Sequence, residues 1–213
     1  MNKLKLEDYK AILSPKHTYH VYNRGIGGEL LFLSNENYRY FLRKYDNYIA
    51  PVADTFCYCL MPNLFHFLIR IKEEKVLKEF FKDKIKNPDS SIDLTGFENL
   101  SGLVSRQFSN FFNAYSKAFN KQHHRSGNLF SRPYKRKLIS DETYLRKVIH
   151  YIHFNPVMAG IVDSLENWEY SSYGSIISNK KTKLQKKEVI SYFDDLENFK
   201  FCHLYPPELT GIE

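Results

Sequence analysis

The sequence has no apolar run long enough to cross a membrane, and it has few cysteines. It contains no stretch of 18 apolar residues and no basic segment leading into a secretion signal. The three cysteines, Cys57, Cys59 and Cys202, are odd in number, and the first two have the spacing of one strand face rather than of a CxxC turn. We therefore expect reduced thiols and a cytoplasmic protein with no membrane partner.

Acidic residues are missing from one long segment. Between Glu98 and Asp141 there is no aspartate or glutamate. This segment holds eight cations, namely Arg106, Lys117, Lys121, Arg125, Arg132, Lys135, Arg136 and Lys137. Without these eight, the 31 basic residues fall to 23 against 24 acidic residues, so the segment accounts for the whole net charge of +7. Because neutralised phosphates release counterions, this pattern predicts a nucleic-acid partner. A solvated basic surface without a partner is the alternative.

The length and the aromatic content fit this prediction. A chain of 213 residues is long enough for one sizeable domain and does not require two. It contains 16 tyrosines and 17 phenylalanines, whose flat rings fill a core and can also stack on bases.

Periodicity predicts a mixed α+β chain. The expected elements are a strand at 17–25, a helix at 35–49, strands at 52–60 and 64–71, a short helix and a surface loop within 73–98, a helix at 103–122, a strand at 134–139 and a helix that Asp141 caps and that runs to about 156. The order strand, helix, strand, strand, helix, strand is typical of ferredoxin-like or RRM-like folds, in which an antiparallel sheet has its helices on one face. We expect the other face to be open.

A helical extension is expected after this domain. We place the main domain at 1–175 and a C-terminal extension, with a small helix pair and no readable role, at 176–213. Ferredoxin-like sheets stack bases in some proteins and hold catalytic residues in others, so the fold class does not choose the function.

The segment "MPNLFHFLIR", residues 61–70, carries a histidine within a strand-like run. Alternation places Phe65, Phe67 and Ile69 on the core face and His66 and Arg70 on the face expected to be open. His66 could meet a ligand there. A histidine with a purely structural hydrogen bond is the alternative.

Four segments together resemble a known family. They are "YHVYNRG" at 19–25, "MPNLFHFLIR" at 61–70, "YIHFNPVMAGIV" at 151–162 and "WEYSSY" at 168–173. In this order they resemble the single-tyrosine HUH transposases, and within them the group related to REP-associated tyrosine transposases. The resemblance implies a transposase that cuts and rejoins single-stranded or hairpin DNA. It also implies a 5′-phosphotyrosine intermediate and a protein that can act as a homodimer.

The resemblance implies a site for Mg²⁺ or Mn²⁺ held by two histidines two residues apart on one strand. Here the second histidine is His66, but the first position is Leu64, which offers no lone pair. Cation affinity should therefore be weakened. His20 and Asn120 are the candidates for additional ligands, each with a purely structural role as its alternative.

The resemblance also implies a nucleophile in the segment "AYSKAFNKQHHRSGNLF" at 114–130, where Tyr115 is the matching tyrosine. Nearby cations would attract phosphate and favour the phenolate. If the implication holds, the Tyr115 hydroxyl and His66 should face one cleft. However, Tyr115 also follows the phenylalanine spacing of its helix, which is typical of a core residue. The predicted DNA contacts are Arg24, Arg70 and the eight cations of the acid-free segment.

Three functions follow. The first is a transposase that cleaves DNA through Tyr115. The second is a weakened or domesticated homologue that binds structured DNA without cleaving it, because Leu64 replaces a metal ligand. The third is an RNA-binding sheet protein, which the lack of the RRM aromatic motif disfavours.

Overall fold

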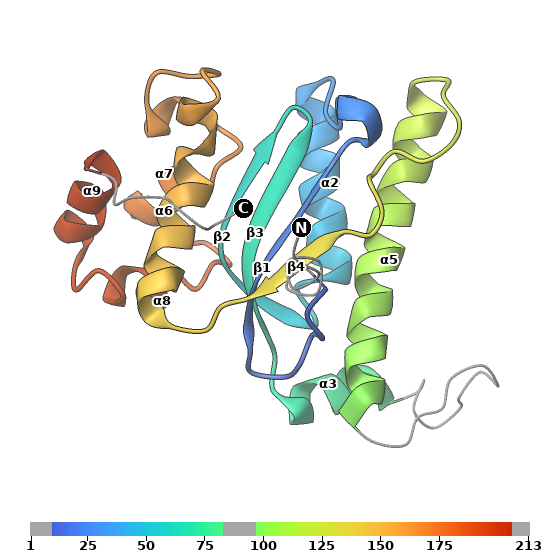
Figure 1. Cartoon of the computed structure of the whole chain (residues 1–213), viewed down its shortest axis with the longest axis horizontal. Helices are drawn as coiled ribbons and strands as arrows, with labels where there is room; N and C mark the ends of the chain where they lie inside the picture. Colours follow the sequence, from blue (N-terminus) through green and yellow to red (C-terminus); the bar gives the residue numbers. More distant parts are fainter. Residues whose placement is uncertain (1–9, 83–96, 206–213) are drawn as a thin grey trace, which may run out of the picture.

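The computed structural model describes residues 10–82 and 97–205, except for the side chains of 97–99, and centres on a four-stranded sheet (Figure 1). The strands are β1 (Thr18–Arg24), β2 (Ala53–Met61), β3 (Leu64–Ile71) and β4 (Lys135–Leu138). They lie in the order β2-β3-β1-β4, and every neighbouring pair is antiparallel. This order and the helices between the strands confirm the ferredoxin-like α+β class.

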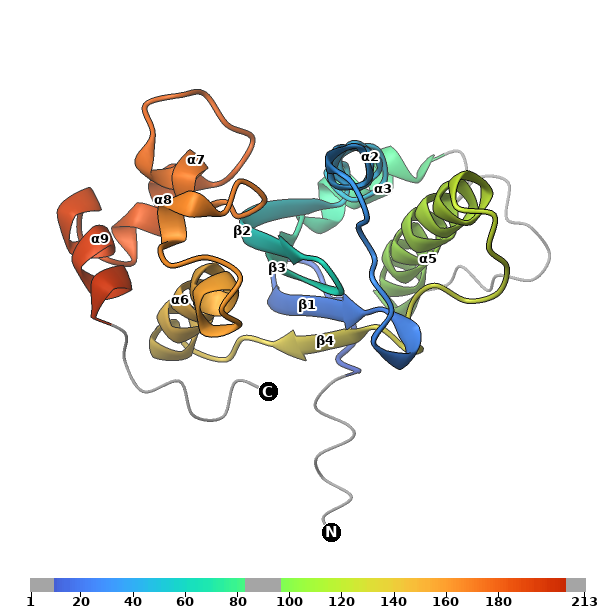
Figure 2. The same cartoon turned by 90° about the horizontal axis from the view of Figure 1, so that it is seen from above.

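One face of the sheet is covered by α2 (Asn35–Tyr48) and α5 (Phe97–Gln122), with the short α3 (Glu74–Phe80) near one end of α5 (Figure 2). On α2, the buried Tyr38, Phe41 and Tyr45 recur at spacings of three and four. The Phe41 and Tyr45 rings meet Phe65 and Phe67, which alternate along β3 and point to the same side. The predicted core face of β3 is therefore confirmed.

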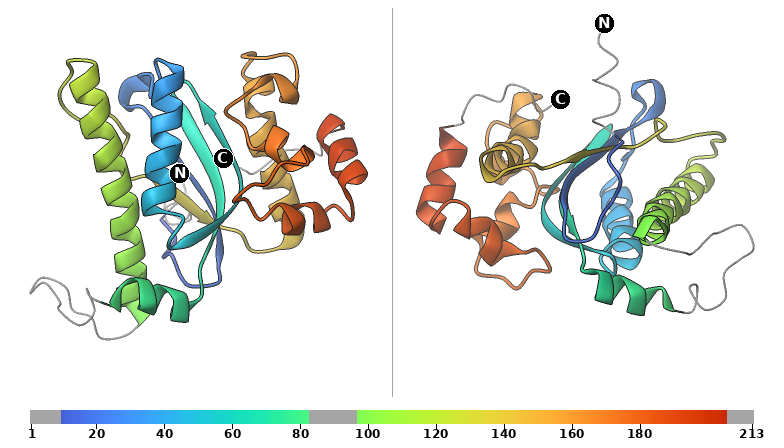
Figure 3. Two further views of the ribbon diagram at one scale, coloured as in Figure 1. Left: turned by 180° about the vertical axis from the view of Figure 1, so that it is seen from behind. Right: turned by 60° about the horizontal axis from the view of Figure 1, so that its bottom comes forward.

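The opposite face is not open, which corrects the sequence-based expectation. It is covered by α6 (Glu142–Met158), followed by the short helix η2 (Leu165–Asn167), α7 (Tyr173–Ile177), α8 (Lys186–Ser191) and α9 (Leu196–Leu204). Leu68 and Cys59 of the sheet pack with Val148 and Ile152 of α6 in a second core. Figure 3 shows from behind and below that the sheet lies between the two helical layers. The chain beyond β4 supplies the apolar surface that sequence alternation could not reveal.

The motif "WEYSSY" closes the outer edge of β2. Leu60 N donates to Tyr170 O at 2.9 Å, and Ser172 N donates to Tyr58 O at 2.9 Å. Further along, Gln185 N donates to Thr55 O at 2.8 Å. These bonds satisfy backbone groups that an edge strand would otherwise leave unpaired.

The C-terminal helices join the second core. Val189 of α8 and Phe199 of α9 are both fully buried within it. The expected small helix pair is thus present, whereas a domain boundary at residue 175 stays a prediction.

No disulfide links Cys57, Cys59 or Cys202. Among the described helices, none combines the length and the apolar character needed to span a bilayer.

Candidate nucleic-acid interface

His20 of β1 and His66 of β3 form a buried pair. Their exposed fractions are 0% and 2%, and His20 Nε2 lies 2.9 Å from His66 Nδ1. Strand register places Tyr22 directly opposite His66, and the Tyr22 ring stacks on His20 at 4.6 Å. Tyr151 of α6 meets both imidazoles edge-on, at 6.2 and 5.6 Å. The histidine expected on an open face is therefore enclosed by rings.

This environment keeps both imidazoles neutral. Burial lowers the pKa of His66 to about 3. It also lowers the pKa of His20 well below its ordinary value, and the positive charges that Lys137 carries and that His66 would carry if protonated lower it further. One neutral ring then donates the shared proton and the other accepts it. The pair is a structural hydrogen bond at the pH of the cell.

Of the predicted cation ligands, His20 and His66 are brought together, but Asn120 is not. The nitrogens with which His20 and His66 face each other are engaged in their mutual hydrogen bond. Asn120 lies on α5, where its side chain donates to Gly127 O at 2.9 Å and accepts from Arg125 at 2.8 Å. In the described part of the chain, no group of three His, Cys, Asp or Glu residues could hold a metal ion. Together with Leu64, this arrangement does not fit a Mg²⁺ or Mn²⁺ site.

Tyr115 lies in the core between the sheet and the helices α2 and α5. His66 lies on the other side of the sheet, so the two residues do not face one cleft. The exposed fraction of Tyr115 is 1%, and its hydroxyl donates to Leu31 O at 2.5 Å. The Phe41 ring meets it edge-on at 4.9 Å. Burial, and next the Tyr38 hydroxyl, raise the pKa of Tyr115 well above its ordinary value, which disfavours the phenolate that attacks phosphorus.

Helix geometry explains this placement. At 3.6 residues per turn, Tyr115 lies roughly 180° around α5 from Arg106. It belongs to the buried side of the helix, together with Phe108, Phe111 and Phe119. The cations of α5 therefore point away from the hydroxyl that they were expected to activate.

The opposite side of α5 is polar, and from residue 99 to the end of the helix the sequence contains no acid. Arg106, Lys117 and Lys121 are exposed there, within roughly 60° of one another around the helix axis. Asn113 lies between the first two and is also exposed. We call this surface the α5 polar stripe. It presents positive charge and amide hydrogen-bonding groups along about four turns of one helix.

A groove follows this stripe. It has a volume of 680 Å³ and lies between α5 and residues 127–134. Its lining includes two cations, seven amide or hydroxyl side chains and three aromatic rings, namely Lys117, Arg132, Asn23, Asn113, Asn120, Asn128, Ser109, Ser116, Ser131, Phe112, Phe130 and Tyr134. None of the described residues that line it is acidic. We call it the α5 groove. Such a groove can accept phosphates on its cations and amides.

Other predicted DNA contacts have partners within the chain. Arg70 donates two hydrogen bonds to Glu188, at 2.6 and 3.0 Å, and does not line the α5 groove. Glu188 thus balances the charge of Arg70 within the chain, and a DNA contact by Arg70 stays a prediction. Arg125 bonds Glu29 and Asn120, and Arg136 donates to Ala11 O at 2.5 Å.

The remaining cations lie around β1 and β4. Lys135 and Lys137 sit over the rings of Tyr22 and Tyr144, at 5.4 and 4.9 Å. Arg24, at the end of β1, and Arg132 are exposed. Of these residues, only Arg132 lines the α5 groove.

Sequence reasoning found the cations of the groove and singled out Asn120 as a candidate cation ligand, but it missed the other amides. Asn113 and Asn120 share the polar side of α5 with Lys117, at spacings of three and four. This spacing in the sequence was enough to place both amides on the same side of the helix as Lys117. Asn23 could not be found in this way, because only the fold brings the end of β1 to α5.

The fold and the groove define a candidate nucleic-acid-binding α+β protein, and comparisons with known proteins relate it to one group. No family model matches the sequence. A "Putative REP-associated tyrosine transposase" of Haemophilus influenzae is 26% identical over 120 residues, which cover 56% of this chain and 58% of that relative. The match thus spans somewhat more than half of the relative's length.

A solved structure agrees. The structure of a REP-associated tyrosine transposase bound to a REP hairpin matches with a TM-score of 0.52 and 14% identity, over 80% of this chain and 85% of the other. This likeness establishes the shared fold. The two comparisons confirm the predicted resemblance to REP-associated tyrosine transposases.

Proposed function

We propose that this protein is a transposase-like DNA-binding protein that holds hairpin or single-stranded DNA in the α5 groove and does not cleave it through Tyr115. One observation carries the proposal: the groove combines Lys117 and Arg132 with amide groups and has no acidic residue among its described lining. Phosphates would be neutralised there without repulsion from carboxylates. The half-buried ring of Tyr134 offers apolar surface to an unpaired base.

The comparisons support hairpin DNA as the substrate class. The relative of known structure is bound to a REP hairpin and shares the fold over most of both chains. The α5 groove belongs to one chain, so the proposal needs only a monomer. A homodimer and a cytoplasmic location stay predictions, and light scattering of the DNA complex would test the first.

Three features support binding without cleavage. Leu64 stands where the family motif has a histidine, and His66 is occupied by its bond to His20. Tyr115 is bound to Leu31 O inside the core. A cleaving conformation would have to expose Tyr115 and break the histidine pair, and both steps cost buried contacts.

The proposed binding of DNA in the α5 groove is tested with a labelled DNA hairpin and two charge-matched variants. The first, called the groove variant, replaces Lys117 and Arg132 of the groove together with Arg106 and Lys121 of the adjoining α5 polar stripe with Gln. The control replaces four exposed lysines outside the groove, Lys75, Lys180, Lys181 and Lys187, with Gln. Fluorescence anisotropy should show roughly 100-fold weaker binding for the groove variant at 0.1 M salt and a salt slope reduced by about 3. Equal losses in the two variants would mean that net charge, not the groove, binds DNA.

The cleavage half is tested on a denaturing gel. We expect no covalent protein–DNA adduct from the wild-type protein with Mn²⁺, and none from Leu64→His, because the second histidine leaves Tyr115 in the core. An adduct that Tyr115→Phe abolishes would overturn the claim that the protein does not cleave DNA, and it would leave the proposed DNA binding intact.

A further inference from the structure

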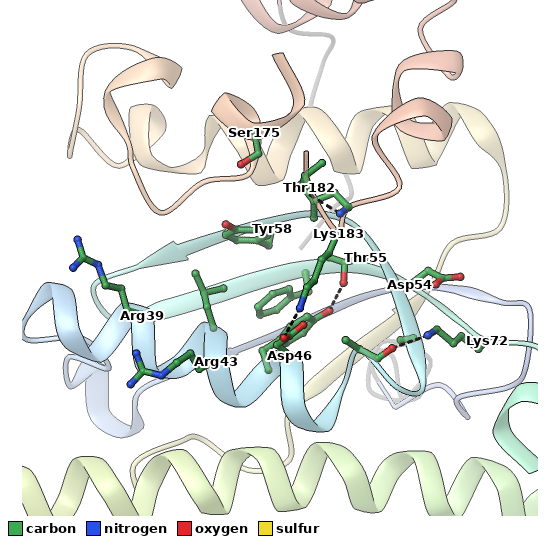
Figure 4. Close-up of a pocket in the computed structure, with 16 residues that line it drawn as sticks. Arg39, Arg43, Asp46, Asp54, Thr55, Tyr58, Lys72, Ser175, Thr182 and Lys183 are labelled. Carbon is green, nitrogen blue, oxygen red and sulfur yellow. Dashed lines mark hydrogen bonds and ion pairs between the residues drawn. The ribbon is translucent and has the colours of Figure 1, made fainter. Parts of the chain in front are cut away.

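A second pocket lies at the β2 edge of the sheet, apart from the α5 groove. It has a volume of 620 Å³, and α2, β2 and residues 175–184 form its walls (Figure 4). Among the residues that the structure describes, none lines both cavities. We call it the β2 pocket. The DNA-binding proposal makes no use of it.

The floor of the β2 pocket is aromatic. Tyr58 of β2 is half-buried, and its ring centroid lies 5.7 Å from that of Phe67. Phe67 stacks on Tyr45 at 4.1 Å with an angle of 6° between the rings. The Tyr45 hydroxyl is fixed by a hydrogen bond to Thr55 at 2.7 Å. The floor is therefore a rigid surface suited to a flat ring.

The rim is rich in cations. Arg39 and Arg43 are exposed one turn apart on α2, and Figure 4 shows both projecting from the same side of the helix. Lys72 lines the pocket and donates to Ala50 O at 2.7 Å. Four cations therefore line the pocket, counting Lys183, against two carboxylates.

Both carboxylates have partners. Lys183, from the segment before α8, contacts Asp46 of α2 at 2.6 Å, and Figure 4 shows this pair spanning the pocket. Asp54 lies 3.9 Å from Arg70. The ion pair of Lys183 is largely exposed, so it can exchange its carboxylate for another anion at little cost.

We infer that the β2 pocket binds a single nucleotide, with its base against Tyr58 and its phosphate on Arg39 and Arg43. The volume falls within the usual range for small-ligand sites. A flat floor beside the exposed guanidinium groups of Arg39 and Arg43 matches a planar base that carries a charged phosphate. The contact of Arg39 with Glu169 at 3.9 Å is largely exposed, so a phosphate can replace it at little cost. The nucleotide is either free or an unpaired residue of a DNA strand, and the second source rests on the proposed function.

Photocrosslinking with 5-iodo-dUMP and with a pentanucleotide that carries a central 5-iodouracil tests the pocket directly in the wild-type protein. Mass spectrometry should place a saturable adduct at Tyr58 or its neighbours. An adduct only outside the pocket, or no saturable adduct from either probe, would overturn the inference. Reaction with 5-iodo-dUMP identifies a free nucleotide as the ligand. Reaction with the pentanucleotide alone identifies an unpaired residue of a DNA strand.

Charge variants give a second readout. Arg39→Gln with Arg43→Gln should weaken binding of the reacting probe roughly tenfold or more, because two charge-assisted contacts are lost. Lys44→Gln with Lys187→Gln is the charge-matched control, since neither lysine lines the pocket. Asp46→Asn should tighten binding several-fold, because it releases Lys183 for the phosphate. Equal affinity in all variants would also overturn the inference.

The hairpin assay separates this inference from the proposed function. A blunt hairpin has no unpaired end for the β2 pocket, so Arg39→Gln with Arg43→Gln should leave its affinity unchanged within about twofold. If the wild-type protein does not bind the hairpin but the free nucleotide reacts at Tyr58, the proposed function fails and the pocket stands. If the hairpin binds and neither probe reacts, the pocket fails alone.

Discussion

The buried histidine pair and the α5 groove both contain polar residues that the sequence marked as functional, yet the fold treats them in opposite ways. His20 and His66 are sealed by Tyr22 and Tyr151 and are neutral. The groove is open and carries positive charge. The difference shows that accessibility, set by α6 and the chain after it, decides which polar residues can meet a ligand.

The same contrast occurs within α5. One side holds Tyr115 in an aromatic core, and the other holds Arg106 and Lys117 in solvent. A single helix thus separates the tyrosine from the charges that would activate it. We expect changes on the first side to alter stability and changes on the second to alter DNA affinity.

The largest effect should come from Tyr115→Ala. Removing a fully buried ring leaves a cavity and should lower the free energy of unfolding by about 3–5 kcal/mol. Tyr115→Phe keeps the ring and loses one hydrogen bond, so it should cost about 1 kcal/mol. Urea denaturation measures both. Weaker hairpin binding by Tyr115→Phe, with no change in stability, would contradict the assignment of Tyr115 to the core.

The second effect is a loss of stability in acid. Burial lowers the pKa of His66 to about 3, whereas an unfolded imidazole titrates near 6.5. Between these values the unfolded chain binds more protons, so stability falls as the pH drops below about 6.5. At pH 5, His66 alone should cost about 2 kcal/mol relative to pH 8.

Denaturation curves from pH 8 to 5 test this prediction. His66→Gln should reduce the loss of stability between pH 8 and 5 by about 2 kcal/mol and leave the part that other buried histidines such as His203 contribute, whereas the control His17→Gln should not reduce it, because His17 is exposed. Identical slopes in the two variants would mean that His66 is accessible to protons in the folded state.

A smaller effect should come from Asn113→Ala in the groove. It removes one amide from the α5 polar stripe and should weaken hairpin binding roughly threefold to tenfold. The melting temperature should not change, since the side chain is exposed. Asn47→Ala on α2, equally exposed and outside the groove, is the control. Unchanged affinity in Asn113→Ala would remove this amide from the interface.

The smallest effect should come from metal ions. Because His20, His66 and Asn120 do not form a ligand set, Mg²⁺, Mn²⁺ or EDTA should shift the melting temperature by less than about 1 °C. Differential scanning fluorimetry measures the shift. A saturable rise with Mn²⁺ that His66→Gln abolishes would restore the predicted cation site.

Periodicity predicted the fold well because it reports local geometry. The alternation of β3 and the spacing of Tyr38, Phe41 and Tyr45 on α2 identified the core face and the order of elements. The same spacing placed Tyr115 in the core, and the structure agrees with it. The expectation that Tyr115 and His66 face one cleft came from the family motif, which carries no information on burial in this chain.

What the sequence could not supply were contacts between distant segments. The bond between His20 and His66 joins residues 46 apart, and Asn23 reaches the groove only through strand pairing. Arg70 looked available for DNA because its partner, Glu188, lies 118 residues further on. Such partners depend on how the C-terminal helices pack, which no local pattern encodes.

The location of bound DNA is tested most directly by lysine acetylation footprinting of the hairpin complex. Lysines that contact phosphates become protected, and mass spectrometry reads each one separately. The account predicts protection of Lys117 and Lys121, with Lys75 and Lys187 reacting as they do in the free protein. Protection of Lys75 or Lys187, with Lys117 and Lys121 still reactive, would contradict it.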